Sequence, residues 1–177
     1  SDLLNGVNGF RIDGEVGTLA TAGVTRNAIA AAGDVNGDGV DDLIIGAQGA
    51  APNGGSSGAA WVLFGKNTAV AGAFAASVSL GGLNGTTGFQ MNGEAVGNQG
   101  GATVAGIGDL NGDGFDDVVV TAYRAAPNGN LSGAAYVVFG HASGFAANLE
   151  LSALDGSNGF QINGAAASNL LGWSADG

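Results

Sequence analysis

The sequence predicts an all-β protein built from four-stranded antiparallel sheets that recur along the chain. Short runs of β-branched and aromatic residues alternate with glycine-rich turns, and the same order of runs appears twice, 75 residues apart. Glycine accounts for 36 of the 177 residues, well above its usual share of about 7%. Glycine at this density suits a fold with many tight turns between short strands.

Each repeat is predicted to contain four strands, named A to D in chain order. Strand D carries the pattern Gly-Phe-x-Ile/Met-x-Gly, which occurs three times. The predicted ranges are 27–33 and 102–108 for strand A, 42–47 and 117–122 for strand B, 58–64 and 133–139 for strand C, and 8–14, 87–93 and 158–164 for strand D.

The residue patterns predict how each strand is exposed. Strand B is apolar at consecutive positions, so we expect both of its faces to be buried. Strand D alternates, with Phe10 and Ile12 on one side and Arg11 and Asp13 on the other, which predicts an outer strand with one solvated face. The Ala-rich segment 69–76 is the candidate for a helix.

Four-stranded units at a fixed spacing are typical of β-propeller blades. We interpret 1–177 as one repeat region: a strand D at 8–14, blades at 27–93 and 102–164, and the start of another blade at 171–177. A propeller needs at least four blades, so two full blades plus flanking strands predict a partial propeller. The terminal strands would lack neighbours, and unpaired edges favour self-association. Four aromatic residues are expected to pack between sheets: Trp61, Phe64, Tyr136 and Phe139.

A nine-residue acidic loop, at 34–42 and 109–117, follows each strand A. Oxygen side chains stand at positions 1, 3, 5 and 9, position 6 is glycine, and position 7 offers a backbone carbonyl. Oxygen-only ligands in a flexible loop favour Ca²⁺ over zinc or copper. We therefore predict two calcium sites. Their ligands would be Asp34, Asn36, Asp38, the Val40 carbonyl and Asp42, and Asp109, Asn111, Asp113, the Phe115 carbonyl and Asp117.

The acidic loops allow other interpretations. Asp, Asn and Gly also form ordinary solvated turns. Two charges about 4 Å apart repel by roughly 4 kcal/mol at an effective dielectric of ~20, so four aspartates in nine residues favour a cation. An EF-hand requires a carboxylate at position 12, where this chain has Ile45 and Val120. The remaining acids, Asp41 and Asp116, are expected to point away from the metal.

The charge and composition of the chain restrict the kinds of partner that it can bind. The net charge is −11, with only four Lys or Arg residues, which argues against nucleic-acid binding. No apolar stretch approaches the ~20 residues of a membrane span, so membrane insertion is not expected. Cysteine is absent, which excludes disulfides and thiol chemistry. Calcium loops favour an extracellular or cell-surface location, because cytosolic free Ca²⁺ is kept low.

Residues 33–47 and 108–122, with the Phe-Gly pairs at 64–65 and 139–140, resemble the FG-GAP repeats of the integrin α-subunit propeller and its bacterial relatives. The resemblance implies that the acidic loops hold Ca²⁺ on the lower face of a propeller. A binding module would contact its partner on the opposite face, with Arg26, Tyr123 and Arg124 as candidates. The loops of that face are 15–26, 48–57, 94–101 and 123–132.

These observations predict a calcium-binding module of a secreted or surface protein that binds a protein or glycan ligand in adhesion. The alternative is a self-assembling structural subunit of an extracellular fibre or sheath. An enzyme is not expected, because the chain has a single histidine, His141, and no recognisable pairing among Glu15, Glu94 and Glu150.

Overall fold

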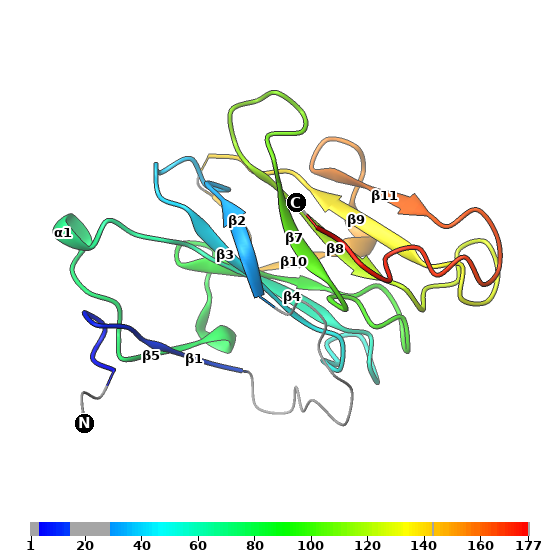
Figure 1. Cartoon of the computed structure of the whole chain (residues 1–177), viewed down its shortest axis with the longest axis horizontal. Helices are drawn as coiled ribbons and strands as arrows, with labels where there is room; N and C mark the ends of the chain where they lie inside the picture. The colour runs from blue at the N-terminus through cyan, green and yellow to red at the C-terminus, as the bar shows by residue number, and fades with distance from the viewer. Residues whose placement is uncertain (1–3, 15–28, 143, 177) are drawn as a thin grey trace.

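The computed structural model describes residues 4–14, 29–142 and 144–176, and it confirms the all-β prediction (Figure 1). The strands form sheets of two, five and four strands. The strands are β1 (Arg11–Asp13), β2 (Ile29–Gly33), β3 (Asp42–Ala47), β4 (Ala59–Leu63), β5 (Ser77–Ser79), β6 (Gly88–Asn92), β7 (Val104–Gly108), β8 (Asp117–Ala122), β9 (Ala134–Val138), β10 (Asn148–Glu150) and β11 (Gly159–Asn163). The helical turns are α1 (Thr68–Ala71), η1 (Leu80–Gly82) and η2 (Leu151–Ala153).

Two antiparallel sheets carry the two sequence repeats. We call β6-β4-β3-β2 the first repeat sheet and β11-β9-β8-β7 the second repeat sheet. In both, strands A, B, C and D lie side by side in chain order, as the sequence predicts. The registers are equivalent, since Ile44 pairs with Val62 in the first sheet as Val119 pairs with Val137 in the second.

Strand D is the outermost strand of the second repeat sheet, as predicted, but the structure corrects this prediction for the other two copies, β1 and β6. The connector after strand C contributes a short strand that pairs in parallel with the strand D of the preceding repeat. Thus β10 lies on β6, and β5 lies on β1. The first repeat sheet therefore has five strands, one of them parallel. Strands of three residues are too short to show periodicity, but the repeated Phe-Ala-Ala at 74–76 and 145–147 marks both connectors.

The helix predicted at 69–76 is reduced to the single turn α1, which overlaps only its first residues. The Asn67 side chain caps this turn by accepting a hydrogen bond from the Ala69 N–H, and Gly72 follows with φ 74°. A left-handed glycine commonly ends a helix, and the chain beyond it reaches the extended strand β5.

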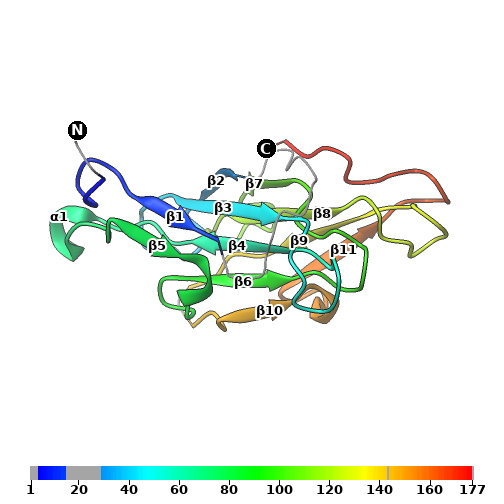
Figure 2. The same ribbon diagram turned by 90° about the horizontal axis from the view of Figure 1, so that it is seen from below.

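The main hydrophobic core lies between the two repeat sheets, which are stacked as neighbouring layers (Figure 2). The first sheet contributes Ile44, Val62 and Phe89, and these pack with Val120 and Tyr136 of the second. A smaller cluster covers the other face of the first sheet. It contains Ile45, Trp61, Leu63 and Leu80, with Phe10, Ile12 and Val78 packed against them.

The two strands A lie in close contact where the repeats meet. A Cβ added to Gly106 of β7 would lie 2.7 Å from the Ala31 carbonyl oxygen of β2. Real Cβ atoms essentially never approach so closely, so glycine lets the two backbones touch. In Figure 1, β2 and β7 lie beside each other at the centre of the molecule. Within the described residues, no helix has the length and apolar character that a bilayer crossing requires.

Candidate metal site in two aspartate loops

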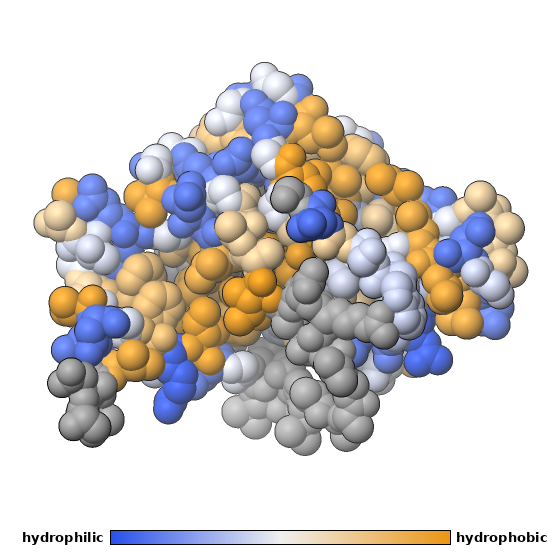
Figure 3. All heavy atoms as spheres, viewed as in Figure 1, coloured by the Kyte–Doolittle hydropathy of each residue, from blue (hydrophilic) through white to orange (hydrophobic). Residues whose placement is uncertain are grey.

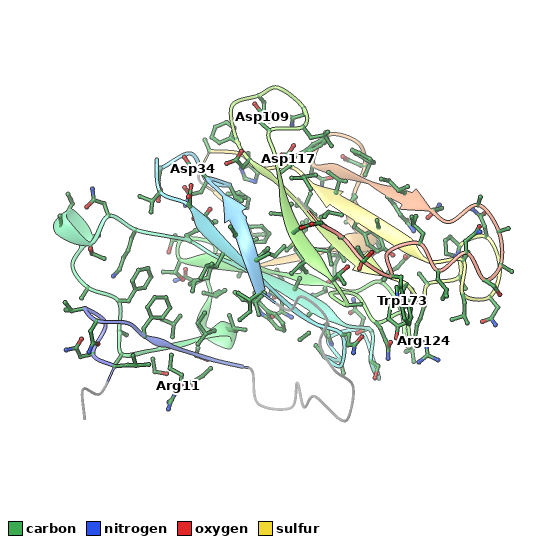
Figure 4. The ribbon with its side chains drawn as sticks, viewed as in Figure 1. Arg11, Asp34, Asp109, Asp117, Arg124 and Trp173 are labelled. Carbon is green, nitrogen blue, oxygen red and sulfur yellow. The ribbon has the colours of Figure 1, made fainter. Side chains whose placement is uncertain are left out.

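The two acidic loops join β2 to β3 and β7 to β8, and both lie at the same edge of the molecule (Figure 4). Each begins at an irregularity in strand pairing, between Ala31 and Gly33 in the first repeat and between Gly106 and Gly108 in the second. Both of these closing glycines have positive φ, 74° and 69°. The left-handed glycine turns the chain out of the sheet, so that the aspartates face one another instead of continuing the ladder.

The first three side chains predicted as ligands in each loop gather around the loop backbone. Asp34 Oδ1 and Asn36 Oδ1 both accept from the Asp38 N–H, at 3.0 and 2.9 Å. Asp34 Oδ2 accepts from the Gly39 N–H at 2.8 Å, and Asp38 Oδ1 accepts from the Val40 N–H at 2.9 Å. The second loop repeats these bonds through Asp109, Asn111 and Asp113. The oxygens of positions 1, 3 and 5 are therefore held on one side of each loop.

The aspartate at position 9 has a structural role that the sequence reasoning missed. Asp42 is buried, and its carboxylate accepts from the Val35 N–H at 3.0 Å and from the Gly65 N–H at 2.8 Å. Asp117 likewise accepts from Leu110 and Gly140, both at 2.9 Å. Position 9 therefore ties the start of the loop to the end of strand C.

The close approach of the position-9 carboxylate to the end of strand C explains why each Phe-Gly pair contains glycine. A Cβ on Gly65 would lie 2.3 Å from the Asp41 carbonyl oxygen, and one on Gly140 would lie 2.4 Å from the Asp116 carbonyl oxygen. Only glycine brings its N–H so close to the position-9 carboxylate. The recurrence of Phe-Gly after each strand C was the available signal for this contact.

Burial raises the pKa of Asp42 to about 6, because the ionised carboxylate has lost its water. The hydrogen bonds from Gly65 and Val35 lower this pKa, whereas the nearby charges of Asp38 and Asp34 raise it. Burial also raises the pKa of Asp117 above its ordinary value.

The donor set of the loops fits a hard cation. Carboxylate and amide oxygens in this order are the ligands that Ca²⁺ prefers. Within the described residues, no three acidic or histidine side chains form a ready-made metal cluster. Oxygens of Asp34 and Asp38 are bonded to backbone N–H groups of their own loop. A bound cation would have to draw these oxygens toward itself. The ligand roles of Val40 and Phe115, through their carbonyls, stay predictions.

The second repeat covers the first loop. The Asp116 carboxylate leaves its own loop, as predicted for position 8, and accepts from the Asp34 N–H at 2.8 Å. The His141 N–H donates to the Val35 carbonyl at 3.0 Å. A Cβ on Gly37 would meet the Phe115 ring at 2.3 Å. The first loop is thus fixed by the following repeat, whereas the exposed second loop has no such cover within the described residues.

The predicted ligand face lies at the opposite end of the strands from the acidic loops. Figure 4 shows Arg124 and Trp173 there, far from Asp34 and Asp109. Arg124 is exposed, and the Tyr123 ring contacts Trp173 edge-on at 5.0 Å. The Gln99 N–H donates to the Ser56 carbonyl at 3.1 Å, which joins the loops 48–57 and 94–101. Arg26, Glu15 and the loop 15–26 lie outside the described residues.

The remaining titratable candidates have packing partners. The His141 ring stacks on Phe145 with 3.8 Å between ring centroids. Glu94 accepts a hydrogen bond of 2.7 Å from the Tyr136 hydroxyl. Glu150 accepts from the side-chain amides of Asn53 and Asn92 at 2.7 and 2.6 Å. The structure thus places these three residues in separate contacts between loops and sheets.

The repeated four-stranded sheets, each with an aspartate loop between its first two strands, define a repeat protein of stacked β-sheets. Residues 27–63 and 100–138 match the FG-GAP repeat family. The chain therefore carries two FG-GAP repeats, consistent with the integrin α-type β-propeller family. The matched segments run from strand A to strand C and contain both acidic loops. A comparison with curated protein sequences gave no match.

Proposed function

We propose that the chain is a calcium-stabilised β-propeller module of a secreted or cell-surface protein that binds a ligand in adhesion. The observation that carries the proposal is the same oxygen-only donor set in two loops, held at the edge where two FG-GAP repeats meet. Two bound Ca²⁺ ions would reduce the net charge from −11 to −7. The cation would act structurally, because it offsets the repulsion among the loop aspartates.

The ligands proposed for Ca²⁺ are those at positions 1, 3, 5, 7 and 9 of each loop. Binding would hold the A–B hairpin closed at the same place where Asp42 ties the loop to Gly65. Extracellular calcium modules commonly bind with Kd values of ~10⁻⁴–10⁻³ M. At a Ca²⁺ concentration ten times Kd, each site would add roughly 1.4 kcal/mol of stability. This dependence suits a protein that functions outside the cell.

The partner is proposed to be a protein or glycan that binds the loops opposite the calcium edge. Loops 48–57, 94–101 and 123–132 lie there, and the exposed guanidinium of Arg124 supplies positive charge in a strongly acidic chain. The proposal includes no catalytic role, no nucleic-acid binding and no membrane insertion.

A thermal melt in 2 mM Ca²⁺, compared with the same sample in excess chelator, tests the proposal. We expect a clear loss of stability in chelator and recovery when Ca²⁺ is restored. Mg²⁺ at the same concentration serves as a control, because Mg²⁺ demands stricter octahedral geometry than a flexible loop provides. Identical melts in Ca²⁺ and chelator would show that the loops are ordinary acidic turns.

A second function, a self-assembling structural subunit of an extracellular fibre or sheath, is favoured by one observation. The exposed hydrophobic residues Leu110, Phe160 and Ile162 all belong to the second repeat, whereas their counterparts in the first repeat are buried. Figure 3 shows apolar residues on one face of the molecule, interspersed with hydrophilic ones. Light scattering across a concentration series would separate an assembling subunit from a single module.

A further inference from the structure

One short segment of the second acidic loop, residues 115–117, belongs to one proposed calcium site and touches the other. Positions 7 and 9 of that loop supply proposed ligands of the second site, the Phe115 carbonyl and the Asp117 carboxylate. Position 8, Asp116, lies between them in the chain and bonds to the first loop instead. Any change that fixes positions 7 and 9 therefore also restricts position 8.

Asp116 holds the first loop at its first ligand, on both sides of the backbone. Its carboxylate accepts from the Asp34 N–H at 2.8 Å, and its own N–H donates to the Asp34 carbonyl at 3.1 Å. The Asp34 side chain in turn accepts from the N–H groups of Asp38 and Gly39, at 3.0 and 2.8 Å. The residue that organises the first loop is thus itself held by the second loop.

The Phe115 side chain adds a packing contact between the loops. A Cβ on Gly37 would lie 2.3 Å from the Phe115 ring, so this ring rests directly against the backbone of the first loop. Gly37 follows Asn36, the proposed position-3 ligand of the first site. Phe115 therefore offers its carbonyl to the second site while its ring supports the first.

Asp117 reaches the first loop by a separate route. Its buried carboxylate accepts from the Gly140 N–H at 2.9 Å. The next residue, His141, donates its N–H to the Val35 carbonyl at 3.0 Å. Val35 is the second residue of the first loop and is fully buried. Positions 7, 8 and 9 of the second loop are therefore all connected to the backbone of the first.

These contacts have a consequence for ion binding. A loop that must be ordered when it binds an ion loses conformational entropy, and this loss weakens the binding. When one site has already ordered residues that the other site shares, the second binding event loses less entropy, which gives positive cooperativity without a large structural change. Such coupling is reciprocal, so each site must strengthen the other by the same factor.

We propose that the two calcium sites bind Ca²⁺ cooperatively, with Asp116 and Phe115 as the residues that couple them. Occupation of the second site fixes the segment 115–117, and this segment then holds Asp34 and Gly37 of the first loop in place. Asp116 is a positioning residue in this arrangement, because it contacts the first loop through Asp34 and is not itself a proposed ligand. The inference rests on the calcium binding proposed above and describes how that binding is regulated.

Ca²⁺ titrations of the isotope-labelled chain, followed by amide NMR, observe the two sites separately. The Gly39 N–H donates to Asp34 in the first site at 2.8 Å, and the Gly114 N–H donates to Asp109 in the second at 2.9 Å. Each amide signal should shift when the carboxylate that it contacts becomes a ligand. The Gly55 amide, in the loop 48–57 at the opposite end of the strands, serves as the reference.

Disabling one site should weaken the other. In Asp113→Ala, which lacks a ligand of the second site, we expect the Gly39 signal to shift at a higher Ca²⁺ concentration than in the parent. In Asp38→Ala, the Gly114 signal should likewise shift at a higher concentration. A joint fit of the three proteins gives one coupling factor, which we expect to be about fivefold or more. Asn111→Ala provides a second way of disabling the second site and should act on Gly39 as Asp113→Ala does.

Asp116→Ala tests the route of the coupling. In this background, adding Asp113→Ala should no longer change the Ca²⁺ concentration at which the Gly39 signal shifts. Asp41→Ala is the matched control, because Asp41 holds the same position in the first loop and its side chain is exposed. In that background, Asp113→Ala should keep its full effect on Gly39.

The outcomes separate this proposal from the calcium proposal. If both amide signals shift with Ca²⁺ but Gly39 responds identically in the parent and in Asp113→Ala, the sites are independent, and the coupling is refuted while calcium binding stands. Coupling that survives Asp116→Ala unchanged would overturn the role assigned to Asp116. If neither the Gly39 nor the Gly114 signal responds to Ca²⁺, the calcium proposal fails and the coupling fails with it.

Discussion

Asp116 and Asp34 are joined by two hydrogen bonds that connect the acidic loop of one repeat to that of the other. The Asp116 carboxylate accepts from the Asp34 N–H at 2.8 Å, and the Asp116 N–H donates to the Asp34 carbonyl at 3.1 Å. Asp34 is also the first proposed calcium ligand. The position of the first loop is therefore set partly by a residue of the second, 82 residues further along the chain.

Replacing Asp116 with Ala should destabilise the protein by about 1–2 kcal/mol, because the Asp34 N–H loses a charged acceptor in a half-buried site. The matched control is Asp41→Ala, at the same loop position in the first repeat, where the side chain is exposed. Asp41→Ala should change the free energy of unfolding by no more than about 0.5 kcal/mol. Urea unfolding of the three proteins measures the difference. If both variants lost the same free energy of unfolding, the contact between the two loops would contribute nothing specific to stability.

The double variant Asp38→Ala/Asp113→Ala should lose most of the stabilisation that Ca²⁺ provides. These aspartates occupy position 5 of the two loops. The Asp38 carboxylate accepts a hydrogen bond from the Val40 N–H, and the Asp113 carboxylate accepts one from the Phe115 N–H. With both sites disabled, the stability in Ca²⁺ should fall by a few kcal/mol in total. Thermal melts in Ca²⁺ and in chelator measure this. Asp176→Ala, an exposed acid outside the loops, serves as the charge control. A double variant that melts like the parent in Ca²⁺ would refute the assigned ligands.

Because the pKa of Asp42 is raised in the folded chain, we expect the free energy of unfolding to depend on pH in an unusual way. Its pKa is about 6 in the folded chain and about 3.9 when unfolded, so the folded state binds the proton more tightly. In chelator, the contribution of Asp42 to stability should therefore increase as the pH falls from above 6 to about 4. Saturating Ca²⁺ favours the ionised carboxylate and should reverse this trend. Melts of the parent and of Asp42→Asn at several pH values isolate the contribution. If the stability of the parent and of Asp42→Asn changed with pH to the same extent, the raised pKa would not belong to Asp42.

Gly65→Ala should destabilise the protein by roughly 1–3 kcal/mol, as overpacking of a tight site does. The new Cβ would lie 2.3 Å from the Asp41 carbonyl oxygen and would displace the N–H that Asp42 accepts. Gly140→Ala should behave similarly. Gly55→Ala is the control, since nothing lies within 4 Å of a Cβ there. Chemical denaturation of the three variants provides the comparison. A neutral Gly65→Ala would mean that the close approach at the Phe-Gly pair is dispensable.

Much of this arrangement could be predicted from the sequence, because the signals were local and repeated. Strand B was predicted with its observed bounds, 42–47 and 117–122, since apolar residues fill consecutive positions. The gathering of loop positions 1, 3 and 5 follows from their spacing around a glycine. Strands β5 and β10 were missed because three residues carry no periodicity, and their pairing with the preceding strand D joins distant segments.

The role of Asp42 was missed for a different reason. Its position in the motif was read as a ligand, but its burial depends on the strands that close over it. Loop periodicity could not reveal that Gly65, 23 residues later, would supply one of its hydrogen bonds. Likewise, Asp116 was expected only to point away from its own loop. Its contact with Asp34 arises from how one repeat packs on the other, which no local pattern encodes.

The parallel pairing of β10 with β6 makes the first repeat depend on the second. Gln90 finds its partner at Ala147, so the outer edge of the first repeat sheet stays unpaired until the ribosome has released residues well beyond that sheet. Synthesis from the N-terminus therefore completes β1 and then β6 in order, because each pairs with a connector strand that is made after it. A nascent chain at this stage would present one unfinished edge at a time, which limits the surface available for misassociation on the ribosome.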